Sequence, residues 1–245
     1  MNKQPVVLVT GGARRVGAAT VRHLHATGCA VAIHYRRSSG EAEALAKELN
    51  AIRPDSAATF PAALEDDAAL PPLVAAVIGR FGRLDGLVNN ASAFYPTHIG
   101  ETTSSQWDDL FAANARAPFF LAQAAAPALR EAKGAIVSIV DIYAERPLAG
   151  HVVYSMAKAA LVMLTQALAK DLAPDVRVNA VAPGAILWPE SGKPEEAVEA
   201  LIAKTPLAHK GDPADVAEAV RWLLLDARYT TGQVIRVDGG RSLTI

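Results

Sequence analysis

Apolar residues follow two patterns that alternate along the chain: short unbroken runs, and longer stretches in which they recur every three or four positions. An unbroken run predicts a strand buried on both faces, as in a parallel sheet, and helical spacing predicts an amphipathic helix. The runs that predict strands are 5–10, 30–35, 57–63, 84–89, 135–140, 176–181 and 233–237. The stretches that predict helices are 18–27, 41–52, 68–81, 104–132, 154–172 and 213–225, the fourth interrupted near Pro118 and Pro127.

This alternation of strands with helices of a dozen or more residues predicts βαβ units. The fold class is therefore α/β, with a doubly wound parallel sheet flanked by helices on both faces. No internal repeat, linker or low-complexity segment divides the chain, so we expect a single domain over residues 1–245. The pattern is less regular after Pro183 and Gly184, and the segment at about 184–210 is expected to form a mobile lid over a substrate.

Composition and charge narrow the range of functions. Hydrophobic residues make up 51% of the chain, and the net charge of −1 gives no reason to expect nucleic acid or a membrane as a partner. The single cysteine, Cys29, is expected to be a packed thiol in a reducing compartment. Because no signal-peptide pattern or apolar run of transmembrane length is present, we expect a cytoplasmic protein. The six histidines lack metal-ligand spacing, and no metal is predicted.

A tyrosine and a lysine four positions apart are the first candidate catalytic groups. On a helix, Tyr154 and Lys158 would lie one turn apart on the same face, where the ammonium would lower the phenol pKa from about 10 toward the range of a general acid. Asp141 follows the predicted strand 135–140, at the strand end where open parallel sheets bind ligands. The alternative is a surface tyrosine and lysine that are four apart by coincidence.

A glycine-rich turn follows the first predicted strand, with the pattern Thr10-Gly11-x-x-x-Arg15-x-Gly17. Glycine lets the backbone approach a diphosphate, and the following helix N-terminus favours negative charge. The spacing G-x-G-x-x-G is absent. This turn alone therefore leaves two interpretations open, a nucleotide site and an ordinary tight connection.

Basic residues replace the acidic residue that an NAD site places after the second strand. The residues there are Arg36, Arg37, Ser38 and Ser39. Guanidinium and hydroxyl groups suit a ribose 2′-phosphate, and Arg15 could converge on it from the turn. We therefore predict NADPH as the cofactor, against the alternative that these arginines form a solvated loop.

Several motifs occur in one order along the whole chain: the turn described above, Asn89-Asn90-Ala91, Asn114, Tyr154-x-x-x-Lys158 and Pro183-Gly184. In this set and order the chain resembles the short-chain dehydrogenase/reductase family. The resemblance implies a Rossmann-type fold, a tyrosine proton donor and a lysine that binds the nicotinamide ribose. It also implies that Asn114 maintains a proton-relay water.

Departures from the usual family pattern resemble the pteridine reductases. They include Arg15 in the turn, Asp141 in place of serine, and the run Asn89-Asn90-Ala91-Ser92-x-Phe94-Tyr95-Pro96-Thr97. In that group a phenylalanine stacks the pterin against the nicotinamide, which here implies Phe94. The implied substrate-binding residues are Arg15, Ser92, Phe94, Asp141, Tyr154 and, in the lid, Trp188. The implied cofactor-binding residues are Gly11, Arg15, Val16, Tyr35, Arg36, Arg37, Ser38, Asn90, Ala91, Ser92, Tyr154, Lys158, Pro183 and Gly184.

The expected reaction is hydride transfer from NADPH to C6 of a dihydropterin, with a proton passed to N5. We assign that proton to Tyr154, with Asp141 relaying it from water. Oxidised pterin and dihydrofolate are expected as further substrates. The alternatives are a carbonyl reductase acting on a 3-oxoacyl thioester or ketone, and a non-catalytic NADPH-binding regulator. Arg146 and His151 are left without a role. Ala-rich faces at 111–128 and 157–169 predict close helix packing in a homotetramer.

Overall fold

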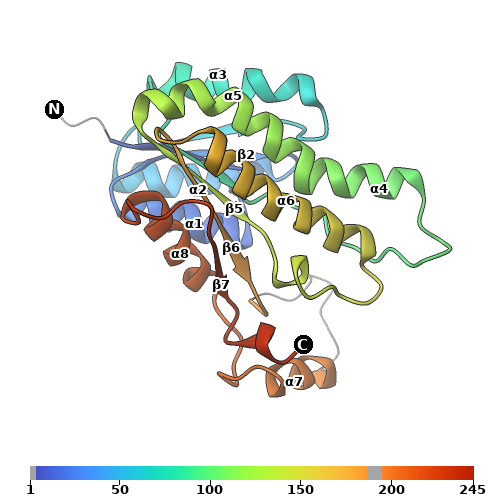
Figure 1. Ribbon diagram of the computed structural model, residues 1–245. Coiled ribbons are helices and arrows are strands. Elements are labelled where there is room, and N and C mark those ends of the chain that lie inside the picture. Colours follow the sequence, from blue (N-terminus) through green and yellow to red (C-terminus); the bar gives the residue numbers. More distant parts are fainter. Residues whose placement is uncertain (1–3, 187–194) are drawn as a thin grey trace.

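The computed structural model describes residues 4–186 and 195–245, and it is built on one parallel sheet (Figure 1). The seven strands lie in the order β3-β2-β1-β4-β5-β6-β7, and every neighbouring pair is parallel. Their bounds are β1 Val6–Val9, β2 Ala30–Tyr35, β3 Ala57–Pro61, β4 Gly86–Asn89, β5 Ala135–Ile139, β6 Arg177–Pro183 and β7 Val234–Val237. The strand order reverses between β1 and β4, so a crevice for a ligand is expected beyond the carboxyl ends of these two strands.

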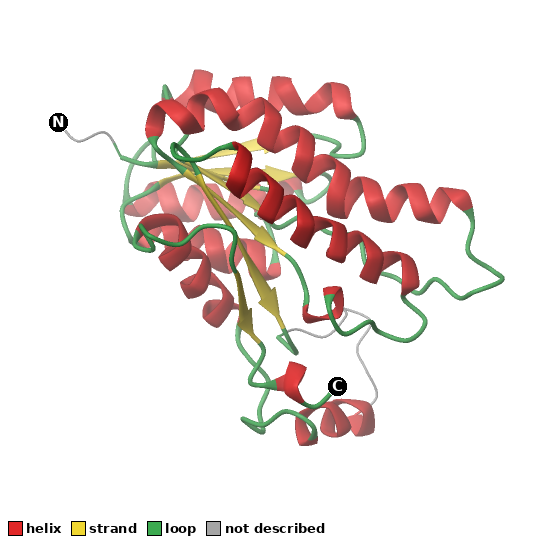
Figure 2. Cartoon of the chain, viewed as in Figure 1, coloured by secondary structure: helices red, strands yellow, loops and turns green. Residues whose placement is uncertain are grey.

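Helices cover both faces of the sheet, which confirms the predicted α/β doubly wound fold (Figures 1 and 2). The helices are α1 Arg15–Ala26, α2 Ser39–Ile52, α3 Leu70–Phe81, α4 Ser104–Phe111, α5 Ala117–Ala132, α6 Val152–Asp171, α7 Glu195–Ala203 and α8 Pro213–Leu225. Along β1, Val7 and Val9 pack with α1, α2 and α8, while Leu8 packs with α3 and α5. Both faces of β1 are therefore buried, which is why its sequence is apolar without alternation.

The predicted long helix at 104–132 is two α-helices joined by a π-helical turn at Ala112–Arg116. The predicted interruption near Pro118 lies just before that residue, because proline has no amide to donate to the carbonyl of Asn114. The predicted interruption near Pro127 is wrong, since Pro127 lies inside α5. Its neighbours Ala125 and Leu129 are fully buried, and this packing offsets the one missing backbone bond.

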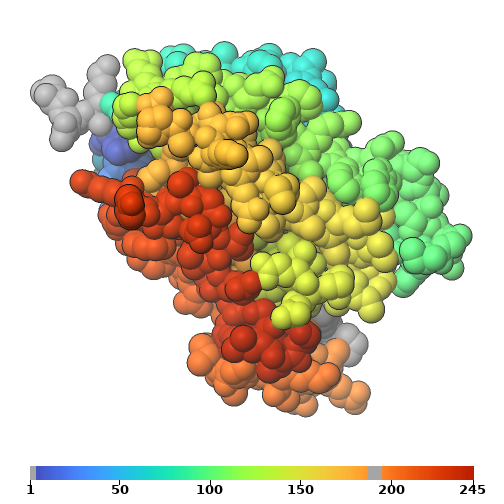
Figure 3. All heavy atoms as spheres, in the orientation of Figure 1, coloured from blue at the N-terminus to red at the C-terminus, as the bar shows by residue number. Residues whose placement is uncertain are grey.

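The predicted lid is more regular than its sequence suggests, because α7 occupies 195–203. Figure 3 shows α7, in orange, lying against the C-terminal residues in red. Hydrogen bonds join the segment just after α7 to the C-terminal residues, since Leu207 N donates to Gly239 O at 3.0 Å and Thr244 Oγ1 donates to Lys204 O at 2.5 Å. Trp188 lies outside the described residues, and its predicted contact with substrate stays a prediction.

Two other sequence features have a clear structural setting. Cys29 is a free, buried thiol whose pKa is raised chiefly by burial, as expected for a packed residue. Helix α6 is the one described helix with the length and hydropathy of a membrane span, at a mean hydropathy of 1.5. It contributes Ala157 and Leu161 to the interior, each at most 1% exposed. Its apolar composition is thus used, at least in part, in packing within the fold.

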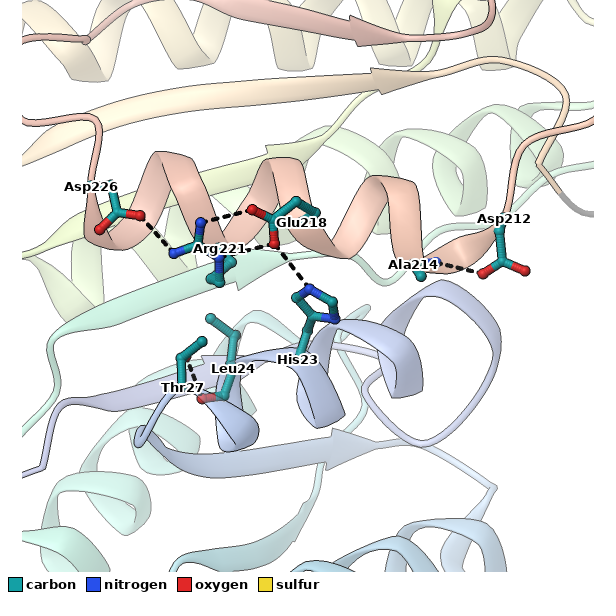
Figure 4. A network of polar contacts seen from close by, with 8 residues as sticks. All are labelled: His23, Leu24, Thr27, Asp212, Ala214, Glu218, Arg221 and Asp226. Carbon is teal, nitrogen blue, oxygen red and sulfur yellow. Dashed lines mark hydrogen bonds and ion pairs between the residues drawn. The ribbon is translucent and has the colours of Figure 1, made fainter.

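An exposed polar network joins α1 to α8 far along the chain (Figure 4). His23 Nε2 lies 3.0 Å from Glu218 Oε2, and Arg221 donates to both Glu218 and Asp226. Exposed ion pairs of this kind contribute little individually. The buried contacts between α1 and α8, including Leu24 and Val220, hold this layer together.

The first turn of α1 packs so closely against Gly11, in the turn after β1, that no side chain fits at Gly17. A Cβ added there would overlap the Gly11 carbonyl oxygen and approach Asn90 Nδ2. We predict that Gly17→Ala destabilises the fold by about 2 kcal/mol or more, on the scale of overpacking in a tight site. The control Gly79→Ala, which meets nothing within 4 Å inside α3, should be neutral or stabilising. Urea unfolding of both variants tests this, and equal stability of the two would contradict it.

Candidate active site

The carboxyl ends of β1 and β4 are tied together by Thr10. Its hydroxyl donates to Val88 O at 3.2 Å and accepts from the amides of Asn90 and Ala91 at 2.9 and 3.1 Å. Asn90 Nδ2 returns two hydrogen bonds, to Thr10 O and Gly11 O at 2.9 and 3.0 Å. The glycine-rich turn and the asparagine motif, which are about 80 residues apart in sequence, therefore form one rigid floor.

A cleft of about 640 Å³ opens above this floor at the carboxyl edge of the sheet. Every residue that the sequence nominated for cofactor binding lines it: Gly11, Arg15, Val16, Tyr35, Arg36, Arg37, Ser38, Asn90, Ala91, Ser92, Tyr154, Lys158, Pro183 and Gly184. The cleft runs from the end of β2 across the switch point to α6. A long, bipartite ligand such as a dinucleotide fits this shape and these linings.

The end of β2 carries the predicted basic cluster. Arg36 and Arg37 are exposed at the cleft edge, and Ser38 lies beside them. Arg36 forms an ion pair with Glu65, and Glu65 also lines the cleft. Sequence analysis missed Glu65, because it reaches this place from the segment after β3. One predicted cation is therefore already paired, whereas no ion pair of Arg37 is recorded among the described residues.

A carboxyl, a phenol and an ammonium meet at the other end of the cleft, as predicted. Tyr154 OH donates to Asp141 Oδ2 at 2.6 Å, and Tyr143 N donates to Asp141 Oδ1 at 2.9 Å. Lys158 Nζ donates to Ile139 O at 2.9 Å and lies 5.8 Å from the centre of the Tyr154 ring. Strand β5 and helix α6 thus deliver three titratable groups to one buried point.

The electrostatics of these groups differ from the expectation. The pKa of Tyr154 is raised, not lowered, first by burial and then by the charge and hydrogen bond of Asp141. Burial lowers the pKa of Lys158 to about 8, and burial raises the pKa of Asp141 despite the phenol that donates to it. The expected lowering fails because burial disfavours the phenolate, and because the nearest partner of the phenol is a carboxylate while the ammonium is bonded to a backbone carbonyl. The Tyr154 phenol therefore keeps its proton and donates it in the hydrogen bond to Asp141.

Asn114 lies in the π-helical turn and is fully buried. Its Nδ2 donates to Ala93 O and Leu110 O, both at 2.9 Å, and its Oδ1 accepts from Ser92 Oγ at 2.7 Å. The side chain therefore holds Ser92 at the cleft wall and does not itself line the cleft. Its predicted role in keeping a relay water stays a prediction.

Phe94 lies at the rim of the cleft rather than in its lining. Its ring stacks on His151 with centroids 4.7 Å apart and an interplanar angle of 14°, and it meets Tyr154 edge-on at 4.7 Å. The phenylalanine is 47% exposed, so part of its surface stays open for a flat ligand. His151, which sequence analysis left without a role, thus supports this ring.

Several further residues of the cleft lining were not nominated from the sequence, among them the titratable residues His34 and Asp109. His34 lies at the end of β2 and contacts Gly11 N and Ala62 O; it directly precedes the predicted cofactor residues Tyr35 to Ser38, and this adjacency could have indicated it. Asp109, on α4, accepts from Tyr95 OH at 2.8 Å and raises the pKa of that phenol, which burial also raises, to about 12. The run that contains Phe94 and Tyr95 could have indicated Asp109 only with knowledge of how α4 packs.

The fold and cleft define a nucleotide-binding α/β oxidoreductase, and comparison with known proteins identifies its family. Residues 11–242 match the family model described as enoyl-(acyl carrier protein) reductase. The chain is 41% identical to pteridine reductase 1 of Leishmania tarentolae, over 98% of this chain and 97% of that protein. It is 35% identical to a 3-oxoacyl-(acyl-carrier-protein) reductase of Staphylococcus aureus, over 95% and 96% of the two chains. It is also 35% identical to a 3alpha-hydroxysteroid dehydrogenase of Mediterraneibacter gnavus, over 98% and 97%.

The chain belongs to the short-chain dehydrogenase/reductase family. It is an oxidoreductase, as members of this family are, and the family uses nicotinamide cofactors with small-molecule substrates. The names of these relatives indicate chemically different substrates: a pteridine, a 3-oxoacyl-(acyl-carrier-protein) and a hydroxysteroid. The family therefore leaves the substrate of this chain to be argued from its own residues.

Proposed function

We propose that this protein is an NADPH-dependent pteridine reductase, which reduces the C6=N5 bond of a dihydropterin to give the tetrahydropterin. The observation that carries the proposal is the 2.6 Å hydrogen bond between Tyr154 and Asp141 inside the cleft. A ring nitrogen must gain a proton as carbon gains hydride, and a carboxyl joined to a phenol can supply it. The 41% identity to a pteridine reductase supports the same reading, and oxidised pterin and dihydrofolate are further candidate substrates.

In this proposal the cofactor supplies the hydride and the chain's own residues orient the substrate and move the proton. Tyr154 donates to N5, and Asp141, whose pKa is raised by burial, replenishes the phenol proton. Lys158 supplies positive charge beside the pair, which limits the cost of leaving negative charge on it. Phe94, braced by His151, offers an aromatic surface that restricts the orientation of a flat pterin.

The second candidate is a carbonyl reductase of the same family, acting on a 3-oxoacyl thioester or a ketone. The similarity to the Staphylococcus aureus reductase and the description of the family model favour it. The buried carboxyl argues against it, because a neutral hydroxyl polarises a carbonyl oxygen without bringing a negative charge near it. A non-catalytic NADPH-binding regulator is disfavoured, since Tyr154 and Lys158 both stand in the cleft.

A substrate panel separates these functions. Purified protein and NADPH are mixed in parallel with dihydropterins, dihydrofolate, a 3-oxoacyl thioester and a simple ketone, and nicotinamide oxidation is followed by absorbance. We expect the highest kcat/KM with a dihydropterin. Preferred turnover of the thioester or ketone would support the carbonyl reductase, and no turnover of any substrate would support the regulator.

Cofactor choice should depend on Arg37 at the end of β2. We propose that Arg37, with Arg15, Arg36 and Ser38, binds the ribose 2′-phosphate of NADPH. Arg37→Asp should raise the KM for NADPH by about tenfold or more and leave the KM for NADH within about threefold, because only NADPH carries the repelled phosphate. Arg80→Asp, an exposed arginine on α3, serves as the control. Equal use of NADPH and NADH by the unmodified enzyme would refute the assignment.

Proton supply should depend on Asp141. Asp141→Asn should keep the fold and NADPH binding but lower single-turnover hydride transfer by about 10²–10⁴-fold, the usual range for a lost acid-base group. Tyr154→Phe should cost at least as much, and the double variant should lose less than the product, since the two act as one unit. Unmodified enzyme should turn over faster as the pH falls, because Asp141 then holds its proton more often, and Asp141→Asn should lose this dependence.

The control for this experiment is Asp226→Asn, which removes a carboxylate from the exposed network of Figure 4. It should leave hydride transfer unchanged at every pH. If Asp141→Asn also turns over normally across the pH range, its carboxyl only caps the loop after β5, where it already accepts from Tyr143 N.

We also propose that the protein is a cytoplasmic homotetramer. Exposed apolar side chains on α5 and α6, including Phe119 at 42% and Met163 at 62%, are available for packing between subunits. Light scattering at micromolar concentration should give a mass near four chains of 25.7 kDa. A monomer mass would refute this assembly.

A further inference from the structure

His34 is a buried imidazole at the carboxyl end of β2, only 1% exposed. The backbone amide of Gly11 donates to its Nδ1 at 3.0 Å, and its Nε2 lies 3.2 Å from Ala62 O. An amide N–H can only donate, so Nδ1 carries no proton, and a carbonyl can only accept, so Nε2 carries one. The two contacts therefore fix both the neutral state and the tautomer, and burial, which lowers the pKa of His34 to about 4, agrees with them.

This one side chain joins three segments that are distant in sequence. Its Nδ1 holds the turn after β1, its Nε2 holds the segment after β3, and its own carbonyl accepts from Gly12 N at 2.9 Å. Ala62 N in turn donates to Tyr35 O at 3.1 Å. Gly11, His34 and Tyr35 all line the cleft. The imidazole thus lies beneath the half of the cleft where the basic cluster is found.

The contact with Gly11 matters because of the backbone conformation there. Gly11 has φ +59°, in the left-handed region, and its carbonyl is held from the other side by Asn90 Nδ2 at 3.0 Å. With both polar groups of Gly11 occupied, the peptide planes of the turn are fixed before any ligand arrives. A turn that is already ordered binds its ligand without an additional entropy cost of ordering.

We propose that His34 is a positioning residue for the dinucleotide, whose neutral imidazole holds the glycine-rich turn in its binding conformation through the Gly11 amide. The role is specific to one acceptor atom. A substitute that fills the space but cannot accept at the Nδ1 position leaves the half-buried Gly11 amide without its acceptor, and the turn then relaxes away from φ +59°. The proposal rests on nicotinamide nucleotide binding and not on the identity of the second substrate.

Three variants separate the acceptor from packing. Asparagine can place an acceptor near the position of Nδ1, glutamine can place its amide donor near Nε2, and leucine keeps only apolar volume. We expect His34→Asn to bind NADPH within about threefold of the unmodified protein. His34→Gln and His34→Leu should bind it roughly ten- to a hundredfold more weakly, the scale of one unpaired buried donor. NADH should follow the same order, because the turn does not read the 2′-phosphate.

The experiment measures nucleotide dissociation constants directly, by titration of the bound nicotinamide fluorescence, and hydride transfer at saturating NADPH. A positioning role predicts a raised dissociation constant and KM for NADPH with an unchanged rate at saturation. If all three variants lower thermal stability but bind NADPH normally, His34 only packs the fold and the proposal is overturned. If His34→Asn binds as weakly as His34→Gln, the Gly11 contact is not the determinant, which also overturns it.

A measurement on the unmodified protein tests the proposal even if the His34 variants fail to fold. Nitrogen NMR of the His34 ring should show a protonated Nε2 and an accepting Nδ1, both without nucleotide and with NADPH bound. Exchange of the Gly11 amide with solvent should be slow in both states and slower with NADPH. Loss of the Gly11 contact in the NADPH complex would overturn the proposal. Because these readouts need no second substrate, they remain informative even if no pterin is reduced.

Discussion

The hydroxyl of Thr10 makes three hydrogen bonds at the point where the strand order reverses, and the rest of the site depends on it. It joins β1 to β4 through Val88 O and the amides of Asn90 and Ala91. With the carboxyl ends of these strands fixed, Gly17 in the first turn of α1 lies so close to Gly11 O that only glycine fits. His34 approaches the same turn from β2. The floor of the cleft is therefore a network of backbone groups held by a few buried polar side chains.

Burial shifts the pKa values of the three titratable groups at the end of the cleft formed by β5 and α6. Tyr154 and Lys158 are buried and Asp141 is half-buried in the cleft wall, and burial disfavours the charged form of each. Tyr154 donates a hydrogen bond to Asp141 at 2.6 Å, while Lys158 donates to Ile139 O. A phenol so committed to a carboxylate is a weak acid by itself. In the proposed mechanism the pair delivers the proton, and a ligand that separates Asp141 from Tyr154 would change both pKa values at once.

The substrate end is shaped by contacts between segments that no local pattern relates. The π-helical turn brings Asn114 against Ser92, and the stack of Phe94 on His151 joins the loop after β4 to the start of α6. These contacts shape the part of the cleft where the proposed pterin would bind. The carboxyl of Asp141 in the same cleft is the feature on which the proposal of a nitrogen-containing ring, rather than a carbonyl, depends.

Local sequence determined the strands, most of the helices and the identity of the groups in the cleft. The reason is physical: unbroken apolar runs need a sheet covered on both faces, and residues at parallel strand ends must share one edge.

Tertiary structure alone decided the rest. It paired Arg36 with Glu65, gave the phenol a carboxylate rather than an ammonium as its nearest partner, and turned His34 into part of the floor. It also kept Pro127 inside α5, because packing against the core outweighs a local propensity. Charge states and partners depend on burial and on distances across the fold, and neither is written in the spacing of residues along the chain.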